Sequence, residues 1–255
     1  DGSARTDASS DSGRDGSGDG GDAGPYTGPS VGTAKTFAAL AYSGITSANI
    51  STIGGELGVS AGAVSTITGF DLAAYTKYGN DSLAPYTMRT LLAQQDVTAL
   101  VGNINPRACD NDLTNVVGGL TGDITLYPGV TCMNSFSADV LINGHVTLDA
   151  RGNPNAFFII RGNKTLTVAD GAEVILANGA EACGVFWRIS AQVTIGKTVK
   201  FYGTVIAGTA ITMNTASTLT GRALAQTANV SFDANAVTIP TNGLVGAPGV
   251  CTHVQ

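Results

Sequence analysis

The chain has little charge, few aromatic residues and no long apolar run. Charged residues make up 13% of its 255 residues and aromatic residues 6%, with one Trp and two His. The 13 Lys and Arg are outnumbered by 19 Asp and Glu, so nucleic-acid binding, which needs clustered positive charge, is not expected. Gly, Thr or a charged residue interrupts each apolar segment well short of the roughly 20 residues of a membrane span. We expect membrane contact at most through a tethered N-terminus.

Cysteine is also scarce. None of the four cysteines, Cys109, Cys132, Cys183 and Cys251, forms a C-x-x-C pair, and no His-rich segment accompanies them, so no metal site or cofactor is expected. Disulfides explain them better, and three pairings are possible. Cys109 and Cys132 bracket a loop-like stretch, which favours a local pair and leaves Cys183 for Cys251. Oxidised cysteines predict a secreted, extracellular protein.

Glycine and apolar residues are abundant, with 34 Gly and 43% hydrophobic residues. This composition predicts many short strands joined by tight turns around one large core. Residues 1–28 contain mainly Asp, Gly and Ser and cannot bury enough apolar surface to fold, so we predict a disordered linker that could tether the protein to the cell envelope. Residues 29–255 are predicted to form a single domain.

One segment has a helical pattern. Apolar residues between Ser82 and Asn103 recur every three to four positions, with Ser82 as a possible N-cap and Pro106 beyond the end. We predict one long helix at about residues 83–103.

The C-terminal half repeats itself every 18 to 20 residues between Gly184 and Pro240, a period that fits one coil of a β-solenoid. Each copy contains an apolar residue, a hydroxyl residue and a second apolar residue in succession. Side chains alternate across a strand, so the hydroxyls point outward and stack into a column. The central residues of these triplets are Thr194, Thr212 and Ser231, and earlier copies of the triplet add Thr147 and Thr167. Ile45-Thr46 resembles Ile211-Thr212 and is expected to join the same face.

Several longer segments resemble a known family. They include FAALAYSGIT at 37–46, LYPGV at 126–130, LDARGNPNAFFII at 148–160 and GTVIAGTAITMNTASTLTGRALA at 203–225. On these motifs, in this order, the sequence resembles the bacterial and fungal ice-binding proteins of the DUF3494 type. The resemblance implies an all-β fold with one long helix: a discontinuous right-handed β-solenoid of triangular cross-section with the α-helix packed alongside. It also implies a non-enzymatic protein that binds ice, causing thermal hysteresis and inhibiting ice recrystallisation. We expect the protein to be a monomer.

In this family the ice-binding face carries motifs of the form T-A/G-x-T/N. Thr209–Thr212 matches in full, Ser190–Val193 and Thr227–Val230 match in part, and Ser43–Thr46 is the N-terminal counterpart. The residues predicted to bind ice are Thr46, Thr147, Thr167, Ser190, Gln192, Thr194, Thr209, Ala210, Thr212, Thr227, Asn229 and Ser231.

Two other functions compete with ice binding. A polysaccharide-cleaving solenoid enzyme would need paired carboxylates, but the acidic residues are dispersed in turn-like contexts, at Asp123, Asp149, Asp170, Glu173 and Asp233. An extracellular adhesion or carbohydrate-binding module would need exposed aromatic rings for sugars to stack on. The single Trp, Trp187, lies in the apolar run VFWRI, where we expect it to be buried.

Overall fold

The computed structural model describes residues 28–71, 74–83, 86–113, 119–133, 139–153 and 155–240. The linker predicted for residues 1–28 therefore lies, except for Gly28, outside the described residues. In the described part, no helix is long and apolar enough to cross a membrane.

The described residues form short parallel strands, three short 3-10 helices and one α-helix. The helices are η1 (Gly32–Thr36), η2 (Val64–Thr66), α1 (Thr87–Ile104) and η3 (Ala182–Gly184). The strands are β1 (Phe37–Ala41), β2 (Ile45–Ser47), β3 (Thr52–Gly54), β4 (Glu56–Val59), β5 (Ile67–Thr68), β6 (Lys77–Tyr78), β7 (Asn111–Asp112), β8 (Leu120–Leu126), β9 (Gly129–Met133), β10 (Val140–Asp149), β11 (Phe158–Gly162), β12 (Leu166–Val168), β13 (Glu173–Ala177), β14 (Val185–Ile189), β15 (Val193–Ile195), β16 (Lys200–Ala207), β17 (Ile211–Met213), β18 (Thr218–Ala225), β19 (Val230–Phe232) and β20 (Ala236–Thr238).

Strand pairing arranges the coils into three strips of parallel sheet. The first, which we call the Thr strip, joins the start of β10 to β12, β15, β17, β19, β2 and β5. The second, the charged strip, contains β8, the rest of β10, β13, β20, β3 and the first halves of β16 and β18. The third, the helix-covered strip, contains β7, β9, β11, β14, β1, β4, β6 and the second halves of β16 and β18.

Two strands cross a corner of the solenoid at glycine. Gly203 of β16 and Gly221 of β18 are level with each other, and Gly203 has a φ of 110°. A Cβ on Gly221 would approach the carbonyl oxygen of Gly203 to 1.8 Å. Only glycine permits these backbones to stack as they pass from the charged strip to the helix-covered strip.

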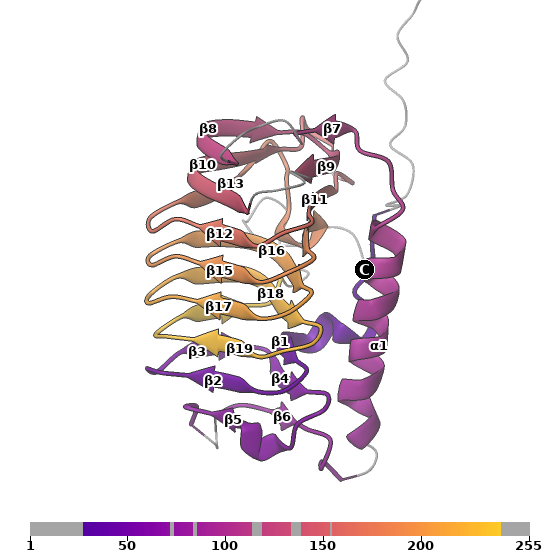
Figure 1. Ribbon diagram of the computed structural model, residues 1–255, viewed down its shortest axis with the longest axis vertical. Helices are drawn as coiled ribbons and strands as arrows, with labels where there is room; N and C mark the ends of the chain where they lie inside the picture. Colours follow the sequence, from indigo (N-terminus) through magenta and orange to yellow (C-terminus); the bar gives the residue numbers. More distant parts are fainter. Residues whose placement is uncertain are drawn as a thin grey trace, which may run out of the picture.

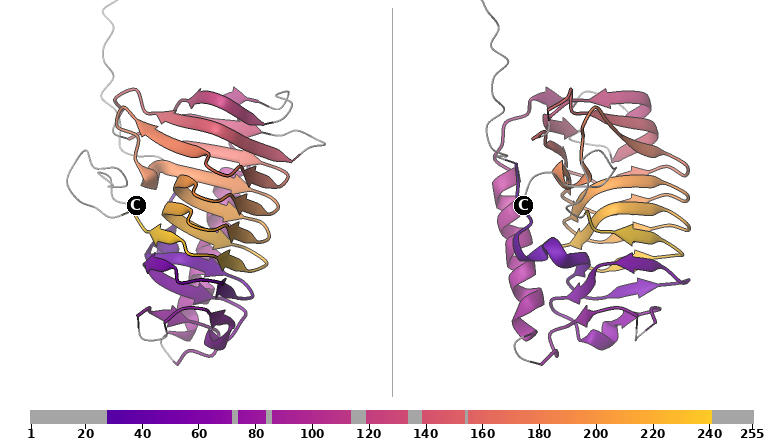
Figure 2. Two further views of the ribbon diagram at one scale, coloured as in Figure 1. Left: turned by 90° about the vertical axis from the view of Figure 1, so that its left-hand side faces the viewer. Right: turned by 180° about the vertical axis from the view of Figure 1, so that it is seen from behind.

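The order of the coils in space differs from their order in sequence. The first coil lies beside the last one, because β1 pairs with both β18 and β4, and β2 pairs with both β19 and β5 (Figure 1). Helix α1 runs along the stack and returns the chain to its other end, where β8 lies (Figures 1 and 2). Its 18 residues span about 27 Å, the height of roughly five or six rungs. The predicted discontinuous β-solenoid with one helix alongside is confirmed.

Apolar residues fill the space inside the coils and the space beneath the helix. Trp187 and Phe201 pack inside, with their ring centroids 4.8 Å apart. Under the helix, buried residues of α1 such as Val97 meet Phe186 and Leu224 of the helix-covered strip. Both clusters are almost free of solvent, so the coils and the helix are mutually rigid.

The helix differs from its prediction in its start and in its buried face. It begins at Thr87 rather than residue 83, and the Ser82 hydroxyl accepts a hydrogen bond from the Gly79 amide instead of capping it. The helical period is correct, but several apolar residues assigned to it are exposed: Leu83, Met88, Leu91 and Leu92. The buried residues are Ala93, Val97, Leu100, Val101 and Ile104.

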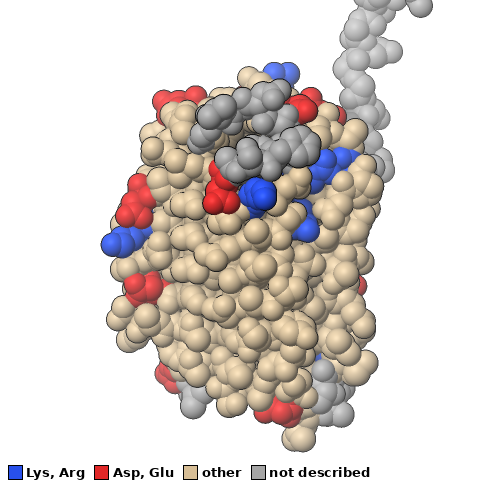
Figure 3. All heavy atoms as spheres, viewed as in Figure 1, with Lys and Arg blue, Asp and Glu red and all other residues tan. Residues whose placement is uncertain are grey.

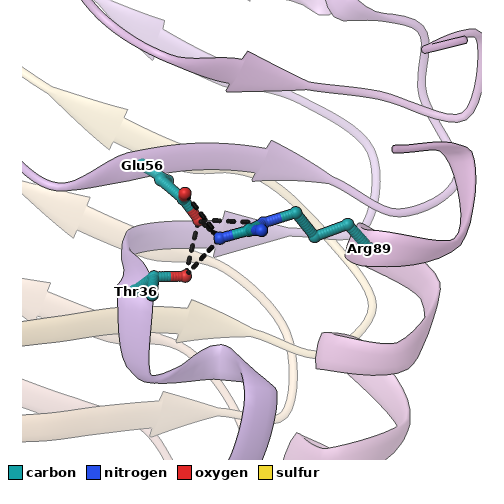
Figure 4. Close-up of polar contacts among 3 residues, drawn as sticks. All are labelled: Thr36, Glu56 and Arg89. Atoms are coloured by element: carbon teal, nitrogen blue, oxygen red, sulfur yellow. Dashed lines mark hydrogen bonds and ion pairs between the residues drawn. The ribbon is translucent and has the colours of Figure 1, made fainter. Parts of the chain in front are cut away.

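Two local tethers fix the helix ends. At the start of the helix, Arg89 Nη2 lies 2.6 Å from Glu56 Oε1 and donates to Thr36 Oγ1 at 3.1 Å (Figure 4). Beyond its end, the predicted Cys109–Cys132 disulfide is confirmed, with the two Cα atoms 5.7 Å apart. The second predicted pair stays a prediction, because Cys251 lies outside the described residues.

Candidate functional site

A column of hydroxyl residues follows the Thr strip from coil to coil. Pairing places Thr167, Thr194, Thr212, Ser231, Thr46 and Thr68 level with one another on successive strands. Their neighbours along each strand are buried, as the 0% and 1% exposure of Ile211 and Met213 illustrates. The hydroxyls therefore face outward about 4.8 Å apart. The predicted column is confirmed as a structural feature for Thr167, Thr194, Thr212, Ser231 and Thr46.

The column also crosses the junction between the two ends of the fold. Thr46 of the first coil donates from Oγ1 to Ser231 Oγ of the last coil at 3.3 Å. It continues to Thr68, which is not among the residues predicted from the sequence. The Ile67-Thr68 pair repeats Ile45-Thr46 and could have identified it.

A second column lies at the entry to these strands, two residues before each member of the first. Its members are Thr165, Gln192, Ala210, Asn229, Gly44 and Thr66. The Gln192 and Asn229 amides donate to Thr194 Oγ1 at 3.1 Å and to Ser231 Oγ at 2.8 Å. These hydrogen bonds join the two columns and restrict the longest side chains of the strip.

One predicted member of the column lies elsewhere. Thr147 is level with Thr125 and Ile175, which places it on the charged strip. Strand β10 passes from one strip to the other, and its first residues, Val140–Ile142, occupy the Thr strip. The assignment of Thr147 to the same column as Thr167 is therefore wrong.

Two partial motifs are shifted by one residue. Val193 and Val230 are both level with Ile211, so the counterparts of Thr209–Thr212 are residues 191–194 and 228–231. Ser190 and Thr227 consequently lie in the preceding turns, where the Thr227 hydroxyl donates to the Gly208 carbonyl oxygen at 2.7 Å. Thr209 is itself exposed at the entry to β17.

The Thr strip and the charged strip differ in the charged side chains that they carry. In the described part of the chain neither column contains an acidic or basic residue, although Lys164 lies exposed just before Thr165. On the charged strip, Asp123, His145, Glu173 and Lys200 are level on consecutive strands, with His145 Nδ1 2.8 Å from Asp123 and Lys200 Nζ 3.2 Å from Glu173. In the space-filling view, the broad middle of the surface is free of charged residues (Figure 3).

Two acidic residues outside this row of level side chains, Asp149 and Asp170, accept hydrogen bonds from turns. Asp149 accepts hydrogen bonds from the Arg151 backbone amide and then the Asn178 side chain, and these lower the pKa of its carboxyl group. Asp170 accepts from the Lys197 backbone amide at 2.7 Å. Across the described ranges, no three His, Cys, Asp or Glu side chains are grouped so as to hold a metal ion.

Trp187 offers no stacking surface for a sugar. It is 0% exposed, and its Nε1 donates to the Tyr202 carbonyl oxygen at 2.9 Å. The burial expected from the sequence is confirmed.

Known proteins share this sequence and this fold. A family model described as ice-binding-like matches residues 39–238. An ice-binding protein of Nostoc sp. (strain HG1) is 36% identical over 211 residues, covering 81% of this chain and 72% of that protein. The crystal structure of an ice-binding protein from an Antarctic biological consortium aligns with a TM-score of 0.74 and 33% identity, covering 85% of this chain and 93% of the other.

A second solved structure extends the similarity to fungi. An ice-binding protein from an Arctic yeast aligns with a TM-score of 0.76 and 28% identity, over 86% of this chain and 98% of the other. The family consists of binding proteins rather than enzymes, which confirms the prediction of a non-enzymatic chain. With the match spanning most of the sequence, the chain belongs to the ice-binding-like family.

Proposed function

We propose that this chain binds ice crystals and that the Thr strip is the surface that meets them. The observation that carries the proposal is the unbroken, charge-free column of six hydroxyl residues on successive strands. Family membership supports ice as the ligand, because proteins that match most of this chain are named ice-binding proteins. The proposed ice-binding residues are those of the two columns together with Thr209.

The other two strips are less suited to a crystalline ligand. Helix α1 packs over much of the helix-covered strip. The charged strip presents Lys200, Glu173 and Asp123, whose charges impose their own hydration geometry on the adjacent water. Elimination therefore favours the same surface as the column does.

The chemistry of the Thr strip fits ordered water. Threonine presents a methyl group and a hydroxyl group on a β-branched stem, so few rotamers are lost when neighbouring water is ordered. Short residues between the hydroxyls, such as Ala210 and Gly44, keep the surface level. The rigid coils beneath hold the spacing constant, so the cost of arranging the surface is met during folding rather than on binding.

Thermal hysteresis is the measurement that tests this proposal. Thr212→Tyr places a bulky ring in the column and should sharply reduce the freezing gap measured by nanolitre osmometry. The matched control is Thr147→Tyr, since Thr147 is half-buried like Thr212 but lies on the charged strip. The control should keep native hysteresis. Equal losses in both variants, or none in Thr212→Tyr, would reject the Thr strip as the binding surface.

Inhibition of ice recrystallisation is expected to follow the same pattern. A protein adsorbed through the Thr strip slows the growth of large grains at the expense of small ones. The Thr212→Tyr variant should lose this effect at concentrations at which Thr147→Tyr retains it. Splat-cooled samples annealed below the melting point measure the grain size directly.

We also propose that the protein acts outside the cytoplasm as a monomer. The Cys109–Cys132 disulfide supports this location, since such bonds persist mainly in oxidising compartments. Fractionation of the native host with non-reducing electrophoresis should find the oxidised protein in the medium or the cell envelope. Finding it reduced in the cytoplasm would overturn the location, and a dimer by light scattering would overturn the monomer.

A further inference from the structure

One arginine joins the end of the helix to the disulfide. Arg161 lies on β11, level with Cys132 of β9. Its Nη1 donates to the carbonyl oxygens of Ile104 at 3.3 Å, of Arg107 at 3.0 Å and of Asn105. Its Nη2 lies 3.3 Å from Cys109 Sγ and 3.1 Å from Cys132 Sγ. The guanidinium therefore contacts both sulfurs while three carbonyl groups hold it in place.

The two cysteines differ in their exposure to solvent. Cys132 is 0% exposed beneath the helix end, whereas Cys109 is exposed in the connection that follows α1. An external nucleophile therefore approaches from the side of Cys109. The sulfur of Cys132 would then be the leaving group.

The electrostatics favour departure of that leaving group. A guanidinium stays protonated at any ordinary pH. A neutral disulfide is a weak hydrogen-bond acceptor, but a thiolate accepts a much stronger, charge-assisted bond. Arg161 thus stabilises the Cys132 thiolate more than the disulfide, and a better-stabilised leaving thiolate departs faster.

Other charged groups lie near this site, but Arg161 makes the closest contact with the Cys132 sulfur. Asp112 is level with Cys132 on β7, and Asp110 is bound to the Val130 amide at 2.7 Å. Arg188 is level with Arg161 on the side away from Cys132. Arg161 is the charged group at hydrogen-bonding distance from the sulfur, where Coulomb interaction is strongest.

We propose that Cys109–Cys132 is a thiol–disulfide exchange site at which a low-molecular-weight thiol becomes attached to Cys109. The thiolate of the incoming molecule forms a bond to Cys109 Sγ, and the Cys109–Cys132 bond breaks. The bonding electron pair leaves on Cys132, whose thiolate Arg161 holds. One disulfide is consumed and one is formed, so no separate oxidant or reductant is required. The bond that fastens the helix-end connection to β9 is thereby released.

Exchange with reduced glutathione tests the proposal on the full chain. Samples are quenched with acid at intervals, and peptide mass spectrometry locates the adduct. We expect glutathione on Cys109 and a free thiol on Cys132. An adduct mainly on Cys132, or no adduct on the folded chain, would overturn the proposal.

Variants separate the electrostatic role of Arg161 from a structural one. Arg161→Met removes the charge and should slow exchange several-fold, although loosening of the helix end alone would expose the disulfide and speed exchange. Arg161→Lys keeps a cation and should remain near the native rate. The matched control is Arg107→Met, because the Arg107 side chain bonds Asn103 and packs over Phe157 rather than the sulfurs. Unchanged or faster exchange in Arg161→Met, with native-like circular dichroism, would refute the role of Arg161.

Discussion

The junction between the first and last coils rests on a buried asparagine. Asn235, between β19 and β20, is 2% exposed. Its Nδ2 donates to the Asn214 carbonyl oxygen at 2.8 Å and to Ser217 Oγ at 2.9 Å, and its Oδ1 accepts from the Asp233 amide at 2.6 Å. Its backbone amide donates to Ser51 Oγ of the first coil at 2.9 Å. This residue orders the turn on which the N-terminal coil docks.

Asn235→Ala should destabilise the fold substantially. The Asn235 side chain makes one further hydrogen bond, from Nδ2 to the Ser217 carbonyl oxygen at 3.2 Å, but Nδ2 has only two hydrogens for its three acceptors. The substitution therefore removes the equivalent of about three hydrogen bonds, each contributing about 1 kcal/mol. It leaves the Asp233 amide without its acceptor, whereas Ser217 Oγ still donates to the Asn214 carbonyl oxygen. We expect a loss of about 3 kcal/mol in the free energy of unfolding. For a domain of this size, that loss lowers Tm by roughly 6 to 12 °C.

Urea denaturation measures this change. An unaltered m-value would show that unfolding exposes the same surface area in the variant as in the native protein. The matched control is Asn229→Ala, since Asn229 is half-buried and its side chain donates to Ser231. The control should cost less than about 1 kcal/mol. If Asn235→Ala costs no more than Asn229→Ala, the reasoning is refuted, because water would then satisfy the turn equally well.

Two further predictions concern turns. Ala216 and Thr198 have positive φ values of 61° and 56°, so Ala216→Gly and Thr198→Gly should each stabilise the fold by about 0.5 to 1 kcal/mol. The control, Ala99→Gly in α1, should instead destabilise the fold by about 1 kcal/mol. A destabilised Ala216→Gly variant would contradict the argument that the positive φ strains the backbone. Hydrogen bonds from the Thr215 hydroxyl and then the Asn49 amide lower the pKa of Asp233 below its ordinary value of 3.8. The carboxylate therefore contributes stability above pH 3.8 that is lost as the pH falls through the folded-state pKa. In Asp233→Asn, the free energy of unfolding should fall less steeply than in the native protein between about pH 5 and pH 2. An equally steep fall in both proteins would argue against this role of Asp233.

The sequence predicted the repeat because side-chain alternation is a local property. Val193-Thr194-Ile195 and Ile211-Thr212-Met213 each bury two residues around an outward hydroxyl, and the structure aligns them. Alternation does not state which strip of a solenoid a strand occupies. Val146-Thr147-Leu148 has the same pattern, yet β10 carries it on the charged strip.

The sequence also did not reveal the exact number of residues in each coil or which face of α1 is buried. Ala207 pairs with Ala225, 18 residues later, but Ile211 pairs with Val230, 19 residues later. The extra residue in the intervening turn displaces Thr227 from the motif, and no periodicity locates such an insertion. In α1, apolar residues occur around much of the helix, so Met88 and Leu92 obscured the stripe of Val97, Leu100 and Ile104 that faces the core.

Direct incorporation into growing ice tests the central claim, that the Thr strip binds ice. Thr212→Tyr and Thr147→Tyr, each carrying a different fluorescent label, would be mixed at equal concentration while an ice hemisphere grows slowly on a cold finger. The account predicts that Thr147→Tyr is enriched in the ice and that Thr212→Tyr stays in the liquid. Equal exclusion of both proteins, or equal incorporation, would contradict it.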